Sequence, residues 1–591
     1  MFNFIFRSKS IFLATSILFA VISCGGTGGN KSGDISTGEI SESESTVVTE
    51  GNVLHVDNQH PDSSDTNPGT AELPLKTISI AAGIADDFKK ANVSTTVLIH
   101  PGTYRESINF PFINDKSQAK MIFEASEKGK VIVSGSDIWT DWDKQQNSNI
   151  YSHDWPFDWG TVKNPWESLG QNLEEIVLRR EMIFVNGEKL TQVLSKNELE
   201  EKSFYVSESQ NNVLIMPPKG VDVNDSIIEV AVRSGLFIVK NRINLELRGI
   251  VFQHDNNGVD HSAVEIDNSP NLILEDCSFV WNNWGGLGLF NTTILTARRN
   301  IANHNGGRGM SAYKIKKLLF EGNETSYNNW RGVRGGFIGF AVSGLKHLRI
   351  HGGVYKNHTS IGNATRGFWL DFDNTNIVIE NAIWKDNLKD AIFIEANEGP
   401  ISIIDSAICN NKDGRGAIIG GNSENVTLKG NLIYNNGNSQ IQIEGGNARN
   451  SNNWETGESF TLDSIGWIIE DNVIVGSGND QLLIERIGSN NFLENFVSDG
   501  NIWINSADEV FKASRSKITD FDGWKSETEQ DQDSVFENSM PTLSNKHNEL
   551  LNICLEEVKN PSPITYVPAQ KRSIKSIIYR KISKLRNQLS I

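Results

Sequence analysis

The sequence predicts an all-β fold, a solenoid of stacked parallel strands known as a parallel β-helix, and three observations support this prediction. From about residue 246, short strands of alternating apolar residues recur along the chain. The side chains expected inside the coils are Ile, Leu, Val and Phe, as an enclosed parallel sheet requires. Asparagines mark the turns at 282, 305, 328, 357, 387, 411 and 435, with successive offsets in sequence number of 23, 23, 29, 30, 24 and 24. A near-constant period indicates a solenoid, in which stacked asparagines would have a structural role.

Composition and charge limit the possible partners. The chain has 591 residues and a formal net charge of −18, which argues against nucleic acid or an anionic membrane surface as its main partner. Its four cysteines are too few for a disulfide scaffold. Cys277 and Cys409 are expected to lie many coils apart, as buried apolar thiols. We expect a monomer.

The N-terminal segment is predicted to be a targeting signal rather than part of the fold. A basic start that includes Arg7 precedes an apolar run at 11–22, which is too short for a comfortable transmembrane helix. The run ends in Val-Ile-Ser-Cys, which resembles a bacterial lipobox and implies a signal peptide at 1–23 and lipidation of Cys24. The alternative is a plain secretory peptide in which Cys24 is incidental. Residues 24–50 would form a flexible tether between a bacterial outer membrane and the folded part.

Three further segments are predicted outside the main run of coils at 246–540. Residues 51–138 would form an N-terminal cap and the first coils, with an alanine-rich helix at 79–90 over the open end. Residues 139–245 break the rhythm and are expected to be a β-rich insertion that packs on the solenoid or overhangs its groove. Residues 541–591 end in a basic stretch with helical spacing and would form a C-terminal tail or cap.

Tryptophans cluster in the insertion, at 139, 142, 155, 159 and 166. The simpler interpretation is that they form the core of the insertion. The alternative is that they are platforms for sugars, because an aromatic ring fits the C–H face of a sugar.

Two successive coils carry a carboxylate at the same position. The segments Gly-Phe-Trp-Leu-Asp and Ala-Ile-Phe-Ile-Glu end at Asp371 and Glu395, one period apart in the sequence. Because side chains of a strand alternate between its faces, Trp369 and Phe393 are expected to point outward with the two carboxylates. In the next coil, Ile418 and Gly420 are expected outward and Ile419 inward. The predicted outward column reads Asp371, Glu395, Gly420 and Glu444.

A column of carboxylates needs a physical reason, because stacked like charges are destabilising. Neighbouring strands lie roughly 4.8 Å apart, close to the about 5–5.5 Å that separates the two carboxylates of a retaining glycoside hydrolase. In that mechanism one carboxylate attacks the anomeric carbon, and the other donates a proton and later accepts one. The alternatives are a solvated acidic edge, or a cation site made with Asp373 and Glu444.

Two longer coils, 329–357 and 358–387, are expected to carry extra loops beside the acid pair. Loop insertions on one side of a solenoid usually build its binding face. Arginines in these loops could bind a uronate or a sulfate, or could equally be salt-bridged at the surface. The predicted substrate-binding residues are Trp330, Arg331, Arg334, Arg366, Trp369, Asp373, Phe393 and Glu444.

The catalytic segments at 367–371 and 392–400 resemble those of the β-helical β-xylosidases of glycoside hydrolase family 120. The cap motif at 97–106, the Asn186-Gly187 strand and the segment 222–230 resemble that family in the same order. The resemblance covers most of 52–480 and implies a right-handed parallel β-helix. It also implies that Asp371 is the nucleophile and Glu395 the acid/base. Hydrolysis by such a pair requires no cofactor, and no metal site is predicted.

One departure concerns the coil before the nucleophile. The resemblance implies a lysine and a histidine there among the sugar ligands. The strand that we expect at this position, 339–344, has neither. Xylose specificity is therefore not predicted, although the carboxylate pair is intact.

Two other classes of function stay open. A polysaccharide lyase needs a basic residue for β-elimination and often calcium to neutralise the uronate; the outward column offers acids instead of a base. A surface solenoid that binds glycans without catalysis is the other alternative, because fold alone does not decide function.

Overall fold

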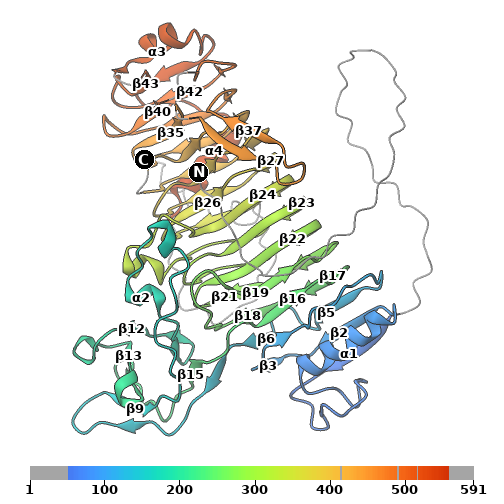
Figure 1. Ribbon diagram of the computed structural model, residues 1–591. Helices are drawn as coiled ribbons and strands as arrows, with labels where there is room; N and C mark the ends of the chain where they lie inside the picture. Colours follow the sequence, from blue (N-terminus) through green and yellow to red (C-terminus); the bar gives the residue numbers. More distant parts are fainter. Residues whose placement is uncertain (1–50, 413–414, 447, 489–490, 515–516, 558–591) are drawn as a thin grey trace, which may run out of the picture. The chain divides into compact units, whose positions relative to one another are not determined.

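The computed structural model describes residues 51–412, 415–446, 448–488, 491–514 and 517–557 (Figure 1). The predicted signal peptide, the tether with Cys24 and the basic C-terminal stretch lie outside these ranges. The described residues belong to one unit, a right-handed parallel β-helix, which confirms the predicted fold class. Among the described residues, no helix is long and apolar enough to cross a membrane.

The N-terminal cap and the first coils contain one helix and six strands. They are α1 (Ile78–Lys90), β1 (Asn52–Val56), β2 (Thr95–Ile99), β3 (Gly102–Tyr104), β4 (Ile108–Asn109), β5 (Met121–Ala125) and β6 (Val131–Ser134).

The insertion contains a short helix and nine strands in two separate sheets. They are β7 (Ser136–Ile138), β8 (Asp143–Lys144), β9 (Tyr151–Asp154), α2 (Glu175–Leu178), β10 (Ile183–Val185), β11 (Glu188–Lys189), β12 (Thr191–Val193), β13 (Ser203–Ser207), β14 (Asn212–Met216) and β15 (Ile228–Ala231).

The main coils follow, and Figure 1 shows their strands stacked side by side. Before and around the acid pair they are β16 (Phe237–Lys240), β17 (Leu245–Arg248), β18 (Ile250–Gln253), β19 (Ser262–Asp267), β20 (Leu272–Glu275), β21 (Ser278–Val280), β22 (Gly285–Arg298), β23 (Met310–Glu321), β24 (Ser343–Lys356), β25 (Thr359–Ile361), β26 (Arg366–Leu370), β27 (Thr375–Glu380), β28 (Ile383–Lys385), β29 (Ile392–Glu395), β30 (Ile401–Ile404) and β31 (Ala407–Cys409).

The later coils also contain a hairpin and two helices. The elements are β32 (Ile418–Gly421), β33 (Val426–Lys429), β34 (Leu432–Tyr434), β35 (Ser439–Glu444), β36 (Arg449–Asn452), β37 (Ser459–Leu462), β38 (Ile468–Glu470), β39 (Val473–Val475), β40 (Leu482–Ile487), β41 (Val497–Asp499), β42 (Ile502–Ile504), β43 (Phe511–Ser514), β44 (Lys517–Thr519), α3 (Phe521–Thr528), β45 (Val535–Glu537) and α4 (Asn545–Leu555).

Inward-facing apolar side chains of successive coils stack in register. Between β26 and β29, Phe368 lies opposite Ile392, and Leu370 lies opposite Ile394. All four side chains are fully buried and belong to one core cluster that continues along the solenoid. Burial of a side chain of this size contributes about 1.5–3 kcal/mol, so the stacking of coils supplies the main stabilisation of the fold.

A column of buried asparagines runs along one corner of the coils. Each side-chain Nδ2 donates to Oδ1 of the asparagine in the next coil, at 2.8–3.0 Å. The column, called here the asparagine ladder, consists of Asn282, Asn305, Asn328, Asn363, Asn387, Asn411 and Asn436. The predicted structural role of the turn asparagines is thus confirmed.

Two of the predicted ladder positions are wrong. Asn363 and Asn436 occupy the ladder in place of Asn357 and Asn435. The step from Asn328 to Asn363 is 35 residues and the next is 24, so one coil is long and not two. The physical reason is that all the extra loop residues lie between Asn328 and Asn363, before the ladder position of that coil.

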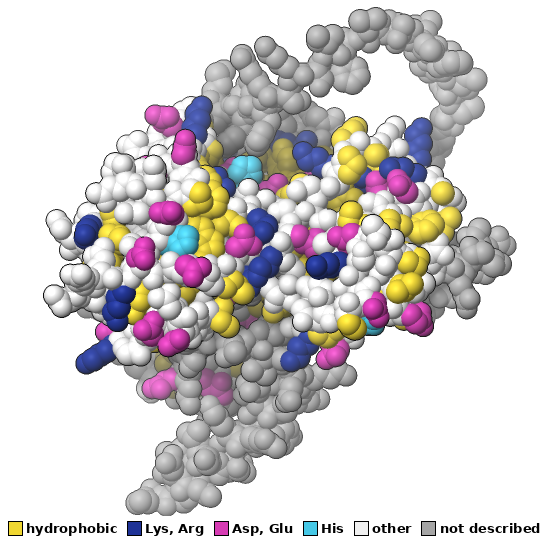
Figure 2. Space-filling model, turned by 90° about the horizontal axis from the view of Figure 1, so that it is seen from below, with side chains coloured by type: hydrophobic (Ala, Val, Ile, Leu, Met, Phe, Trp, Pro, Cys, Tyr) yellow, Lys and Arg dark blue, Asp and Glu magenta, His cyan; other side chains and the backbone are white. Residues whose placement is uncertain are grey.

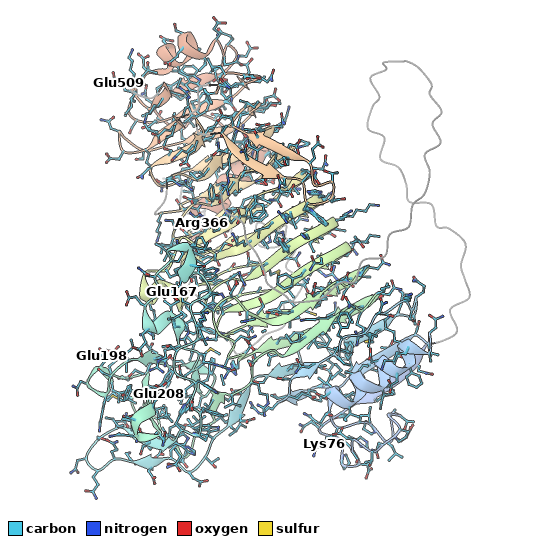
Figure 3. All side chains as sticks on the ribbon, viewed as in Figure 1. Lys76, Glu167, Glu198, Glu208, Arg366 and Glu509 are labelled. Atoms are coloured by element: carbon cyan, nitrogen blue, oxygen red, sulfur yellow. A yellow bond between two sulfur atoms is a disulfide. The ribbon has the colours of Figure 1, made fainter. Side chains whose placement is uncertain are left out.

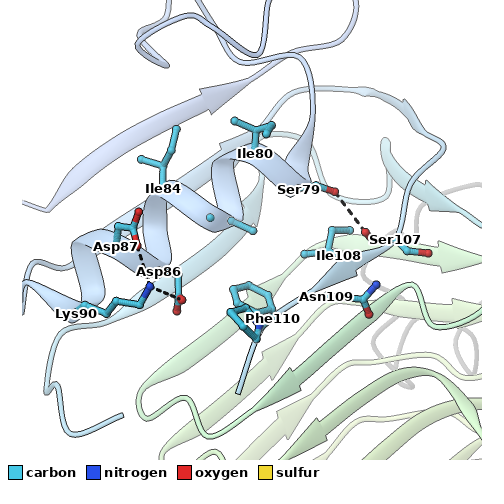
Figure 4. Close-up of a pocket in the computed structure, with 13 residues that line it drawn as sticks. Ser79, Ile80, Ile84, Asp86, Asp87, Lys90, Ser107, Ile108, Asn109 and Phe110 are labelled. Atoms are coloured by element: carbon cyan, nitrogen blue, oxygen red, sulfur yellow. Dashed lines mark hydrogen bonds and ion pairs between the residues drawn. The ribbon is translucent and has the colours of Figure 1, made fainter. Parts of the chain in front are cut away.

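The helix α1 covers the N-terminal end, as predicted. Its apolar face joins the core, and the Asp86 carboxylate on it accepts a hydrogen bond at 2.7 Å from Nε of the buried Arg242. A cavity of about 490 Å³ lies between α1 and β4 (Figure 4). It is lined by cap residues such as Ile84, Asp87 and Phe110, and none of its lining residues belongs to the coils of the acid pair.

Helix α3 packs over the last coils through Trp524, which is fully buried against Phe511 and Phe496. Helix α4 packs on strands β31 and β34, where Cys554 forms a disulfide with Cys409. The prediction of a buried thiol at Cys409 is therefore wrong, whereas Cys277 is a free buried cysteine. The disulfide was missed because its two cysteines are 145 residues apart in sequence.

The insertion forms two sheets of its own, in which every strand pair is antiparallel except the parallel pair β12–β13. Trp142 and Trp155 are buried in its core, and Trp139 and Trp159 pack against it, which supports the simpler interpretation of these side chains. Trp166 instead packs against the solenoid, beside Trp284. The strand β16 pairs in parallel with β4 and β19, so the solenoid resumes at Phe237, before the predicted boundary at 246.

Figure 2 views the molecule from below Figure 1 and shows Lys and Arg side chains interspersed with Asp and Glu on that face. The described residues of this face therefore offer no extended basic surface of the kind that binds nucleic acid.

Candidate active site

The register of β26 and β29 brings the two predicted catalytic residues together. Trp369 lies opposite Phe393 and Leu370 opposite Ile394, so Asp371 comes opposite Glu395 one coil away. One coil step is roughly 4.8 Å. Their side chains are 13% and 21% exposed, so both carboxylates face a partly shielded surface.

The outward column differs from the predicted one at a single position in the next coil. Gly421, and not Gly420, lies opposite both Glu395 and Glu444. Gly420 faces inward, where an added Cβ would clash with the Trp467 ring. The physical reason is an extra residue in the turn that precedes β32, whose length the strand pattern does not fix.

The same shift reverses the predicted directions of Ile418 and Ile419. Ile418 pairs with the inward Ile392, and Ile419 packs outward against Phe393. The rings of Trp369 and Phe393 pack at an interplanar angle of 34°, with their centroids 5.7 Å apart. Together with Ile419 they form an apolar strip beside the carboxylates.

Lys346 of β24 is the direct partner of Asp371. Its Nζ lies 2.6 Å from Oδ2 of Asp371 and 3.2 Å from the centroid of the Trp369 ring. Burial lowers the pKa of Lys346, although the carboxylate of Asp371 acts in the opposite direction. The second oxygen of Asp371 accepts a hydrogen bond from the Phe372 N–H at 2.9 Å. Both contacts fix the position of the Asp371 carboxylate.

The sequence-based prediction that residues 339–344 form the strand one coil before the nucleophile is wrong, because β24 occupies that position. In the register of β24 and β26, Lys346 lies opposite Trp369 and His347 opposite Leu370. The lysine is therefore present in the expected coil. His347 points inward, with Nδ1 2.7 Å from the Tyr355 hydroxyl, and its burial lowers its pKa to about 3.

Glu395 is held from two sides. Its Oε2 accepts a hydrogen bond from Nε1 of Trp369 at 3.1 Å, and its Oε1 lies 2.6 Å from Nη1 of Arg449. Arg449 begins β36, the first strand of a hairpin with β37. The hairpin thus reaches back from a later coil to the acid pair.

Asp373 anchors this hairpin. Its carboxylate is fully buried, accepts from the Trp454 N–H at 2.9 Å and lies 3.2 Å from Nε2 of His351. Nδ1 of His351 in turn lies 2.6 Å from Oε1 of Glu455 at the hairpin tip. Burial lowers the pKa of His351, but the carboxylates of Asp373 and Glu455 outweigh it, so that its pKa is raised. Asp373 thus contacts the hairpin that covers the site.

Arg366 and Arg415 lie over the apolar strip. Arg366, labelled in Figure 3, donates to Oδ2 of the buried Asp390 at 2.8 Å, with its guanidinium 4.8 Å from the Trp369 ring. Arg415 lies 4.6 Å from the Phe393 ring and donates to Oε2 of Glu444 at 2.7 Å. The pKa of Glu444 is raised, chiefly by burial, despite Arg415.

The structure does not bring Trp330, Arg331 and Arg334 to the acid pair. Arg331 is buried in the contact with the insertion, where it donates to the carbonyls of Ile176 and Glu181. Its burial lowers its pKa to about 9. The Trp330 ring lies 4.0 Å from Nζ of Lys189, and Arg334 follows in the same short turn. Their predicted substrate contacts stay predictions.

Sequence reasoning missed Lys346, Arg415 and Arg449. One period of the earlier asparagines, counted back from Trp369, leads to Lys346 and could have identified it. Arg449 lies 54 residues from Glu395, on a hairpin that no period predicts. Among the described residues, no group of three or more His, Cys, Asp or Glu side chains is arranged to hold a metal ion.

Comparisons with known proteins agree with the fold. Residues 262–433 match the model of the family described as right handed beta helix region. A structure of XylC in complex with xylose is similar over 83% of this chain and 86% of its own, with 14% identity and a TM-score of 0.61. A structure named glycoside hydrolase covers 76% of this chain and 96% of its own, with 11% identity and a TM-score of 0.49.

The A-module of the mannuronan C-5 epimerase AlgE4 from Azotobacter vinelandii covers 82% of this chain and all of its own, with 13% identity and a TM-score of 0.44. No curated protein matches the chain in sequence. At such identities, structural similarity establishes the fold and leaves function to the site.

Proposed function

We propose that this protein is a retaining glycoside hydrolase that acts on a polysaccharide or oligosaccharide, with Asp371 as nucleophile and Glu395 as acid/base. The observation that carries the proposal is the register of β26 and β29, which sets these carboxylates on adjacent coils. One coil step of roughly 4.8 Å suits the about 5–5.5 Å spacing of retaining enzymes. The similarity to a xylose-bound protein of the same fold supports a sugar as ligand.

The proposed reaction has two steps. First, an oxygen of Asp371 forms a bond to the anomeric carbon while the glycosidic bond breaks, and the leaving oxygen takes the proton of Glu395. Then Glu395 takes a proton from water, whose oxygen attacks the anomeric carbon and releases Asp371. Lys346 holds the Asp371 carboxylate in place through its ammonium, and Trp369 orients Glu395 through its indole N–H. The reaction needs no cofactor.

The test is to incubate the purified chain and its Glu395→Gln variant with plant and algal polysaccharides and aryl glycosides. New reducing ends without ultraviolet absorbance of unsaturated sugars, lost in the variant, are expected. Binding of oligosaccharides without any cleavage would instead favour a glycan-binding solenoid.

A second candidate is a polysaccharide lyase, and Lys346 is the observation that favours it. A buried lysine with a lowered pKa can serve as a base. In this reaction Lys346 would take the proton at C5 of a uronate, and a C4–C5 double bond would form as the C4–O bond breaks. The leaving oxygen would take a proton from Glu395 or from water. Unsaturated products that disappear in Lys346→Met would establish the lyase and remove the nucleophile role from Asp371.

We also propose that Cys24 carries a lipid that holds the protein on a bacterial outer membrane. Cys24→Ser is then expected to move the protein from the membrane fraction to the soluble fraction. An unchanged distribution would refute this anchor.

A further inference from the structure

The outward column of side chains has a gap directly beyond Glu395. Gly421 lies between Glu395 and Glu444 in the register, so the column itself contributes no side chain at this position. An added Cβ at Gly421 would meet only the Phe393 ring, at 3.2 Å. Two coil steps, roughly 9.6 Å from twice the usual strand spacing, therefore separate the backbones that carry the two carboxylates. The edge of an aromatic ring borders the gap.

Two arginines from different elements flank this gap. Arg415 precedes β32 and lies 2.7 Å from Oε2 of Glu444, whereas Arg449 of the hairpin lies 2.6 Å from Oε1 of Glu395. Their side chains are 39% and 43% exposed, in contrast to the buried Arg366 and Lys346. Arg415 also has Nη2 3.9 Å from Oδ2 of Asp390. Each guanidinium has five N–H donors, and these ion pairs engage only part of that set.

We propose that the sugar unit on the leaving-group side of the scissile bond carries an anionic substituent, a carboxylate or a sulfate ester, that Arg415 and Arg449 bind. This inference rests on the proposed function, in which Glu395 protonates the leaving oxygen and so marks the leaving-group side. A guanidinium fork matches the oxygens of both groups. The Phe393 ring gives the sugar an apolar surface beside them.

The pairing of Arg449 with Glu395 has a consequence for catalysis. Glu395 has to donate a proton to the leaving oxygen, but its Oε1 is engaged by Nη1 of Arg449 at 2.6 Å. An anionic substituent that draws Arg449 away removes this obstacle. The substrate charge would thus contribute to turnover as well as to binding, and neutral substrates would be turned over slowly.

The experiment compares oligosaccharides that differ only in charge: oligouronates with their methyl esters, and sulfated galactan oligosaccharides with their desulfated forms. The variants are Arg415→Gln and Arg449→Gln. The control is Arg299→Gln, which removes a guanidinium paired with Asp276 at 2.9 Å on the first half of the solenoid. The readouts are kcat/KM for each substrate, and calorimetric binding to Glu395→Gln.

The wild type is expected to prefer one anionic series by at least about tenfold, equivalent to about 1.4 kcal/mol. Arg449→Gln should raise the activity on the neutral partner and lower it on the anionic one, while Arg299→Gln keeps the preference. Preference for the oligouronates would identify the anionic substituent as a carboxylate, and preference for the sulfated oligosaccharides would identify it as a sulfate ester. Equal use of charged and neutral substrates, or a preference unchanged in both variants, would overturn the inference.

The binding measurement separates this inference from the proposed function. If no substrate is cleaved, the hydrolase proposal fails, but a charge preference in binding that Arg415→Gln weakens would still uphold the anion site. Cleavage of neutral substrates with no charge preference in either readout would uphold the hydrolase and refute the anion site.

Discussion

The asparagine ladder and the outward column of carboxylates run through the same coils, but their polar side chains are paired in different ways. In the asparagine ladder, Asn387 donates to Oδ1 of Asn411 at 2.9 Å and accepts from Nδ2 of Asn363 at 2.8 Å, and all three side chains are buried. In the outward column, Asp371 and Glu395 are partly exposed and each pairs with a cation outside the column.

Within these coils, the ladder asparagines contribute to stability, whereas the outward carboxylates serve the proposed reaction. The ladder amides satisfy one another from coil to coil, because an amide is both donor and acceptor. Carboxylates cannot do so, since ionised oxygens only accept, and stacked like charges repel. The outward column therefore needs the counter-charges of Lys346 and Arg449. Four substitutions test this contrast.

The largest effect is expected for Glu395→Gln. Loss of a general acid/base lowers turnover about 10²–10⁴-fold, whereas the midpoint of thermal unfolding should change little, because the amide still accepts from Trp369. Activity on reducing ends and thermal unfolding are the measurements. Glu380→Gln, which removes a carboxylate paired with Lys356 at 3.3 Å at the end of β27, is the control and should leave both unchanged. A folded and fully active Glu395→Gln would contradict the catalytic role of Glu395.

The ladder should show the reverse pattern. Asn387→Ala removes the acceptor of the buried Asn363 backbone N–H and the side-chain donor to the Ser360 carbonyl and to Asn411 Oδ1, and each buried unsatisfied group costs about 1–3 kcal/mol. We expect a stability loss of about 2–4 kcal/mol on that basis, measured by denaturant unfolding. Asn435→Ala is the matched control, because Asn435 lies next to the ladder and makes an exposed bond to Asn410. Equal losses in the two variants would contradict a special role of the ladder.

Lys346→Met sharpens the contrast inside the site. It removes the ammonium that positions Asp371 and keeps the apolar stem on Trp369. A nucleophile that is less well positioned should lower kcat about 10–100-fold. If the wild type forms unsaturated products and Lys346→Met loses all activity, the lyase is supported instead. An unchanged kcat in Lys346→Met would show that Lys346 has no role in the reaction.

The smallest effect is a pH dependence of the hairpin. Because the pKa of His351 is raised in the folded protein, its stabilisation is fully present below its ordinary value of 6.5 and is lost as pH rises through the folded pKa. Amide hydrogen exchange of β36 and β37, corrected for the intrinsic rate, should therefore accelerate severalfold above pH 6.5. In His351→Gln this pH step should be absent. A step that persists in the variant would point to another group.

The sequence-based predictions succeed where coils have equal length. Asp371 and Glu395 are predicted in the correct register because the chain between them has no inserted residue. One additional turn residue is enough to exchange Gly420 and Gly421, since a shift of one residue turns every side chain to the other face. The long loop before Asn363 displaces one ladder position in the same way.

Long-range partners could not be predicted from the repeat. Arg449 approaches Glu395 through a hairpin, and the Cys409–Cys554 disulfide depends on where α4 packs. Arg331 is the opposite case. It is predicted to bind substrate from a surface loop, but it is buried against the insertion. A period fixes which residues stack, whereas loops fold back according to contacts that have no period.

The most direct test of the central claim is to trap the covalent intermediate. The wild-type chain is treated with a 2-deoxy-2-fluoro glycoside of a sugar that it cleaves, and the labelled peptide is identified by mass spectrometry. A slow glycosyl intermediate is expected on Asp371, with no label in Asp371→Asn. A label on another carboxylate, or steady cleavage of the natural substrate that never yields a labelled Asp371, would contradict the proposed pair.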